Sequence, residues 1–149
     1  MSKYLVVAHQ TATNLALQDK LREIAAKDRT ATFTLIVPAT PIEHLLTKHE
    51  GEAKAVAEQS AVEARALMVR HRLRIEDAIV GDESPIEAIG DLLRDSPPGT
   101  YDGIVISSLP PGISRWLKLD VHARASQRFD VPVISVIAPR TEAGTDARS

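Results

Sequence analysis

Short runs of aliphatic and β-branched residues alternate with longer segments of helical periodicity along the whole chain. The runs lie at 4–8, 31–37, 74–80, 102–107 and 131–136. Their near-continuous apolar character is typical of strands that helices cover on both faces. Strands that alternate with helices predict a parallel sheet with right-handed crossovers. We therefore expect an α/β fold, a three-layer α/β/α sandwich around a five-stranded parallel sheet.

The segments between the runs carry helix signals. Leu17, Leu21 and Ile24 recur at helical spacing, and Asn14 offers an N-cap before them. A helix over 85–94 is predicted by a capping box that has proline at its first helical position, Ser84-Pro85-Ile86-Glu87. Small residues at helical spacing predict a long helix over 50–72, and a last helix ends near Phe129.

Composition narrows the class of protein. A chain of 149 residues matches one domain, which we place at 1–137, followed by a mobile tail at 138–149. The net charge of −2 favours neither nucleic acid nor a membrane surface as partner. The absence of cysteine excludes disulfides, thiol catalysis and cysteine-based metal sites. No signal peptide or membrane span is evident in the sequence, so we expect a cytoplasmic protein.

In an open parallel sheet, small molecules bind beyond the carboxyl ends of the strands. Loops that leave the predicted strands therefore supply the candidate site. Its residues are His9, Gln10, Thr11, Val37, Pro38, Gly81, Asp82, Ser107, Ser108, Gly112, Ile113 and Arg115. Serine hydroxyls and the N–H groups of Gly112 and Ile113 could hold a small anion or a nucleoside, although the loop could equally serve only to close a turn.

Catalytic chemistry has weak support. His9 could act as a base or hydrogen-bond a ribose, but we favour a polar cap on the first helix. No activating base for Ser107 or Ser108 is evident from the sequence. A loop containing His44, His49 and Glu50 matches no zinc pattern, and we interpret it as solvated. The main catalytic signatures are absent, so a binding module is favoured over an enzyme.

The last helical region has two further features. Its cationic residues make it locally basic, which we interpret as a solvated helix face; they are Arg115, Lys118, His122, Arg124 and Arg128. Trp116 could anchor an interface or pack against the sheet, and both readings stay open.

The order of elements, the turn of Gly81, Asp82 and Pro85 before the third helix, and Pro132-Val133 in the last strand resemble the universal stress protein family. The resemblance covers residues 3–137 and implies an adenine-nucleotide α-hydrolase-like fold. It also implies dimerisation through the last strand in many members and ATP binding in some. A loop with two glycines, followed later by glycine and Ser or Thr, is the nucleotide motif of that subgroup.

This chain departs from the motif. The pattern falls on 107–110 and then on Leu119-Asp120, and its glycines are absent. Pro110 and Pro111 have no N–H to donate to a phosphate. We expect Asp120 to cap the following helix with its carboxylate, which would occupy the place of a phosphate and repel it. His9-Gln10-Thr11 stands where the family usually has an acidic residue after the first strand.

An edge strand needs protection or a partner, and the last strand is apolar. Its residues Val131, Val133, Ile134 and Val136 are therefore predicted to pair with a second copy of the chain.

Three functions remain open at this point. The first is a non-enzymatic binding or regulatory module of the universal stress protein type with a degenerate nucleotide site, for which no cofactor is certain and ATP or AMP is possible. The second is a small nucleotide hydrolase, assisted by a bound water or by His9. The third is a dimeric domain that binds only protein partners.

Overall fold

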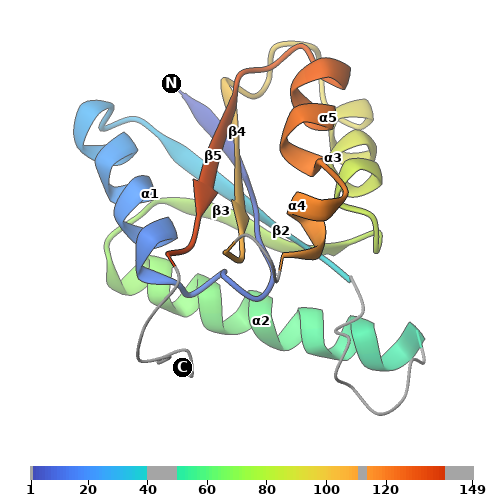
Figure 1. Ribbon diagram of the computed structural model, residues 1–149. Coiled ribbons are helices and arrows are strands. Elements are labelled where there is room, and N and C mark those ends of the chain that lie inside the picture. The colour runs from blue at the N-terminus through green and yellow to red at the C-terminus, as the bar shows by residue number, and fades with distance from the viewer. Residues whose placement is uncertain (1, 40–49, 111–113, 140–149) are drawn as a thin grey trace.

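The computed structural model describes residues 2–39, 50–110 and 114–139. Strands and helices alternate along it (Figure 1). In chain order the elements are β1 (Lys3–Val7), α1 (Leu15–Lys27), β2 (Thr32–Pro38), α2 (Glu50–Arg70), β3 (Ile75–Gly81), α3 (Pro85–Arg94), β4 (Gly103–Ser108), α4 (Arg115–Lys118), α5 (Val121–Arg128) and β5 (Val133–Ile137).

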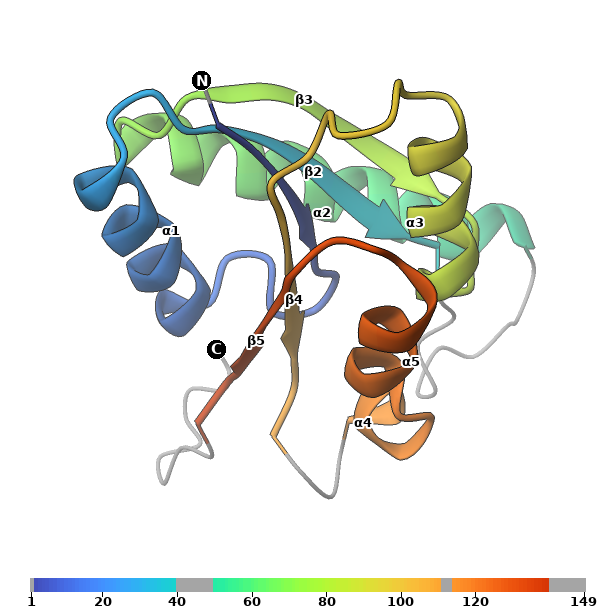
Figure 2. The ribbon, with the colours of Figure 1, turned by 90° about the horizontal axis from the view of Figure 1, so that it is seen from above.

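The strands form one five-stranded sheet in the order β3-β2-β1-β4-β5, and every neighbouring pair is parallel. The predicted fold class is therefore confirmed. In Figure 2, α1 and α2 cover one face of the sheet, and α3, α4 and α5 cover the other. Such a three-layer arrangement explains why the strands are apolar on both faces.

Local sequence signals explain where two helices begin. Asn14 caps α1, because its side chain accepts a hydrogen bond from the N–H of Ala16 at 2.8 Å. Ser84 caps α3 by accepting from the N–H of Glu87, and Pro85 takes the first helical position. Both starts agree with the sequence prediction.

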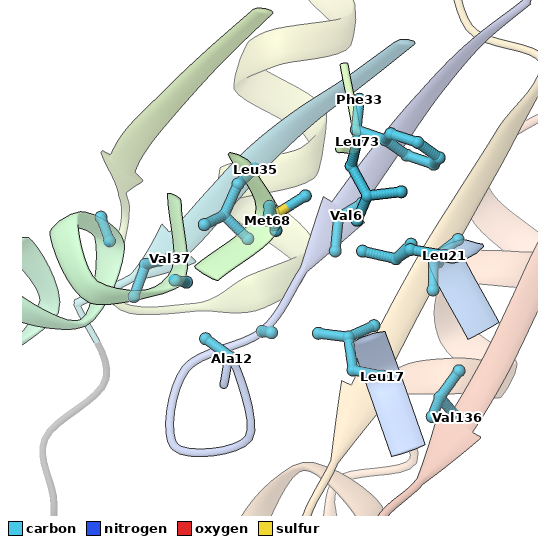
Figure 3. Packing of buried hydrophobic residues seen from close by; sticks show 14 of the residues in the cluster. Val6, Ala12, Leu17, Leu21, Phe33, Leu35, Val37, Met68, Leu73 and Val136 are labelled. Carbon is cyan, nitrogen blue, oxygen red and sulfur yellow. The ribbon is translucent and has the colours of Figure 1, made fainter. Parts of the chain in front are cut away.

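A core lies on each face of the sheet. On the side of α1 and α2, Leu17 and Leu21 pack with Phe33, Leu35 and Met68, as Figure 3 shows. A second cluster on the other face joins residues of the strands to α3, α4 and α5. Its largest members include Leu5, Ile36, Ile86, Ile89, Ile104, Ile106 and Trp116.

The predicted last helix, which follows Asp120 and ends near Phe129, is α5, whereas the short helix α4 before it was not predicted. Asp120 has the left-handed backbone conformation, with φ 57° and ψ 40°. An ordinary N-cap has extended backbone, so the Asp120 side chain makes no cap hydrogen bond. The prediction that its carboxylate caps the helix is therefore wrong. The loop between β2 and α2 and the C-terminal tail lie largely outside the described residues.

Candidate functional site

The carboxyl ends of all the strands meet at one edge of the sheet, because the strands are parallel. Backbone hydrogen bonds continue the pairing just beyond three of them: Ala8 N–H donates to Ile36 O, Ala39 N–H to Gly81 O, and Ala138 N–H to Ser108 O. This edge therefore brings together the loops in which the candidate residues were predicted.

His9 follows the central strand β1 and is almost fully covered, with 6% of its surface exposed. Neither ring nitrogen has a hydrogen-bond partner among the residues that the structure describes. Burial lowers the pKa of His9 below its usual 6.5, so the ring is neutral at pH 7. Its backbone carbonyl accepts from Ala12 N–H, but its side chain does not cap α1, so the favoured interpretation as a helix cap was wrong.

Thr11 and Ser107 are joined directly. Their hydroxyl oxygens lie 2.6 Å apart, and both side chains are buried. This bond fastens the loop after β1 to the end of β4, the strand beside it. Both residues were predicted to line the site, and the structure places them together with their hydroxyls turned toward each other.

The other predicted residues at this edge differ in role. Val37 and Pro38 are buried at the end of β2, whereas Gln10 is exposed. A Cβ atom on Gly81 would come within 2.8 Å of the Cβ of Ala88, so glycine allows α3 to approach the end of β3. The carboxylate of Asp82 accepts from the N–H of Ser84 and shapes the same turn.

Ser108 belongs to a second hydrogen-bonded group. Its hydroxyl lies 2.6 Å from Nε2 of His122 on α5, and Nδ1 of the same ring lies 2.8 Å from the hydroxyl of Ser135 on β5. Burial lowers the pKa of His122, while the negative charge of Asp120 partly opposes that shift. Sequence reasoning missed this group, since it treated His122 as part of a solvated basic face.

One signal could have indicated the contact between β4 and α5. Alternation along β4 puts Ile104, Ile106 and Ser108 on one face, and the helix that follows β4 must cover one face of the sheet. The remaining basic residues fit the solvated interpretation in part. Arg124 and Arg128 are exposed, and Arg128 pairs with Glu87 at 3.5 Å.

Several predicted residues cannot be placed. Pro111, Gly112 and Ile113 lie outside the described residues, as do His44 and His49, and the same holds for the side chains of Glu50, Arg115 and Lys118.

Asp120 is exposed at the junction of α4 and α5. Trp116 is buried, with 7% of its surface exposed, in the core cluster beneath α4 and α5. Of its two open readings, packing against the sheet is confirmed.

The residues that the structure describes offer neither a metal site nor a membrane-spanning helix. Within those residues, no group of three or more His, Cys, Asp or Glu side chains could hold a metal ion. None of the helices there combines the length and the apolar character that crossing a membrane requires.

No family model matches the chain, and no curated protein matches it in sequence. Solved structures do match it. A universal stress protein from Archaeoglobus fulgidus in complex with dAMP is 15% identical with a TM-score of 0.60, over 91% of this chain and 97% of that one. A universal stress protein in complex with cAMP is 17% identical with a TM-score of 0.62, over 93% and 98% of the two chains. A universal stress protein family protein from Arabidopsis thaliana with AMP bound is 14% identical with a TM-score of 0.56, over 100% and 99%.

The chain has the universal stress protein fold. The matches extend over nearly the whole of each chain, so the resemblance that the sequence suggested is confirmed for the entire architecture. At these identities the likeness concerns the fold, and function has to be argued from the site.

Proposed function

We propose that this chain is a binding module of the universal stress protein type, without turnover, that takes an adenine mononucleotide or nucleoside at the carboxyl edge of its sheet. The observation that carries the proposal is His9, which is buried at that edge with both ring nitrogens unpartnered among the described residues. Three solved structures with the same fold contain dAMP, cAMP or AMP.

A buried polar group without a partner is costly, and in native proteins such a group calls for an explanation. A neutral imidazole has one N–H donor and one acceptor nitrogen. A ribose hydroxyl can donate and accept, so it can satisfy either nitrogen of His9 once binding uncovers that nitrogen. Ligand binding would thereby supply the hydrogen bonds that the described fold leaves unmade.

The phosphate side of the site argues against a triphosphate as the preferred ligand. Pro110 and Pro111 remove two N–H donors from the loop after β4. Pro110 is buried, and its carbonyl accepts from Ser114 N–H, so this donor is already occupied and is not free for a phosphate. We therefore expect AMP or adenosine to bind more tightly than ATP.

Thermal unfolding with millimolar adenosine, AMP or ATP, each with and without magnesium, tests the proposal. A ligand at 100 times its dissociation constant stabilises the folded state by about 2.7 kcal/mol and raises the melting temperature by a few degrees. We expect this shift with AMP and adenosine in the wild type and its loss in His9→Ala.

His71→Ala is the matched control, because His71 lies beyond the end of α2 and its Nδ1 contacts Gln18 rather than the carboxyl edge. The ligand-induced shift, measured against each variant's own melting temperature, should survive in this control. No shift with any of the compounds in the wild type would overturn the proposal. Release of inorganic phosphate or of free adenine from these compounds would overturn the non-enzymatic part of the proposal and favour a hydrolase.

We also propose that two copies of the chain pair through β5 in the cytoplasm. The support is that β5 lies at an edge of the sheet and consists of Val133, Ile134, Ser135, Val136 and Ile137. An unpaired apolar edge strand invites pairing with another strand. Analytical ultracentrifugation should show a dimer at micromolar concentration, and Ile134→Pro should convert it to a monomer. A monomer at all concentrations would refute the pairing.

A further inference from the structure

One imidazole joins three elements of the fold on the face of the sheet that α5 covers. His122 comes from α5, Ser108 from the end of β4 and Ser135 from β5. The two serines occupy opposite nitrogens of the ring, at 2.6 Å from Nε2 and 2.8 Å from Nδ1. A hydroxyl, a base and a group that orients the base, all within hydrogen-bond reach, form the general arrangement of an activated nucleophile.

The two hydroxyls differ in access. Ser108 is buried, with 2% of its surface exposed, whereas Ser135 is exposed to solvent. The buried serine can hold the ring in place, and the exposed one can meet a substrate. The tautomer that carries its proton on Nε2 donates to Ser108 and leaves the lone pair of Nδ1 directed at the hydroxyl of Ser135.

We propose that Ser135 is an activated serine that accepts an acyl group from a small activated ester, with His122 as its general base and Ser108 as the residue that positions the imidazole. This site is separate from the proposed nucleotide site at His9 and does not depend on it.

The reaction balances as a transfer between two oxygens. The Oγ atom of Ser135 forms a bond to the acyl carbon as its proton passes to Nδ1 of His122. The bond between the acyl carbon and the leaving oxygen then breaks, and the proton on Nδ1 passes to that oxygen. The products are an ester on Ser135 and a free alcohol or phenol, and the imidazole is neutral again.

Charges around the ring favour a neutral base. The strands β4 and β5 contain no titratable side chain, so neither places a charge against the imidazole. From α5 and its start come Asp120, Arg124 and Arg128, all exposed. Burial keeps the pKa of His122 below 6.5 in spite of Asp120. At pH 7 the ring can therefore accept a proton, as a general base must.

Acetylation by p-nitrophenyl acetate, followed by trypsin digestion and mass spectrometry, tests the proposal on the intact chain. The tryptic peptide 129–140 contains Ser135 as its only hydroxyl residue. The peptide 125–128 contains Ser126, an exposed serine on α5, and serves as a control within the same sample. General-base catalysis contributes about a hundredfold or more, so we expect Ser135 to be acetylated at least about tenfold faster than Ser126.

The pH profile and the variants distinguish general-base catalysis by His122 from simple exposure of Ser135 to solvent. The rate at Ser135 should rise with pH and reach half of its plateau below pH 6.5, where His122 loses its proton. Ser135→Ala should remove the label from its peptide, and His122→Gln should lower the rate at Ser135 to that of Ser126. Ser108→Ala should lower the rate, and Ser108→Thr, which restores a hydroxyl, should recover it.

Equal labelling of Ser135 and Ser126 in the wild type would overturn the proposal. So would a flat pH profile, or a folded His122→Gln variant that is labelled like the wild type. Should His122→Gln fail to fold, as circular dichroism would reveal, the ratio of the two peptides and the pH profile in the wild type still decide the question.

Discussion

Two histidines of this chain are buried with the same effect on their pKa values, but their hydrogen bonding is opposite. Burial lowers the pKa of both His9 and His122. His122 has a serine hydroxyl on each ring nitrogen, whereas His9 has no partner for either nitrogen among the described residues. The partners, more than the burial, decide whether a buried ring stabilises its fold.

The difference follows from where each ring lies. His122 lies over β4 and β5, and two strands of the fold offer it hydroxyls. His9 follows β1, whose neighbours on either side are β2 and β4. The nearby hydroxyls of Thr11 and Ser107 are already bonded to each other. The fold thus supplies the hydrogen-bond partners of His122, whereas His9 needs partners from a bound ligand.

The largest effect is expected when His122 is replaced by Leu. The substitution introduces an apolar side chain of similar volume and leaves the buried hydroxyl of Ser108 without its partner. An unsatisfied buried group costs about 1–3 kcal/mol, so the free energy of unfolding should fall by about 2 kcal/mol. Urea unfolding measures the change. Arg124→Leu, at an exposed position of the same helix, is the control and should stay within about 0.5 kcal/mol of the wild type.

The opposite change in the free energy of unfolding is expected for His9→Leu. Here the substitution removes two unpartnered nitrogens from a buried position and leaves no other group stranded. We expect the free energy of unfolding to rise by about 1 kcal/mol without ligand. His71→Leu is the control, because it removes the contact of His71 with the buried Gln18 and should destabilise the fold. A loss of stability in His9→Leu would show that its ring is satisfied after all.

The sequence predicted the architecture well because local signals determine it. Alternating apolar runs and helical stripes indicated each strand and every helix except α4, and the caps at Asn14 and Ser84 lie where expected. The short helix α4 was missed, and Asp120 was expected to cap α5 although its backbone is left-handed. A non-glycine residue in that conformation is uncommon, and an Asp before a helix ordinarily predicts an N-cap.

The candidate site was predicted in its parts but not in its pairings. His9, Thr11, Ser107 and Ser108 were all expected at the carboxyl edge, and the structure places them there. That Ser107 bonds to Thr11 and Ser108 to His122 follows from the alternation of neighbouring residues across a strand, which turns the two serines to opposite faces. Which residue meets each serine depends on tertiary packing, which cannot be inferred from the sequence alone.

Acid should weaken the fold through both histidines. Each has a lower pKa in the folded state than in the unfolded one, so the unfolded chain binds more protons near and below pH 6.5. Their contribution to stability is fully present above pH 6.5 and is lost as the pH falls toward the lowered values. Urea unfolding across this range should show a shallower decline in His9→Leu and in His122→Leu than in the wild type. An identical decline in all three proteins would contradict the assignment.

The smallest expected effects distinguish the two serines that are hydrogen-bonded to His122. Ser135→Ala removes an exposed hydroxyl, and water can take its place at Nδ1, so stability should change by less than about 0.5 kcal/mol. Ser108→Ala removes a buried hydroxyl bond and should cost about 1 kcal/mol. The order of the two losses of stability matters more than their sizes. A hydroxyl whose only role is stability should cause the larger loss when it is removed. If Ser135→Ala proves the more damaging of the two, Ser135 is a structural tie between β5 and α5, and its proposed role as the reactive serine loses its basis.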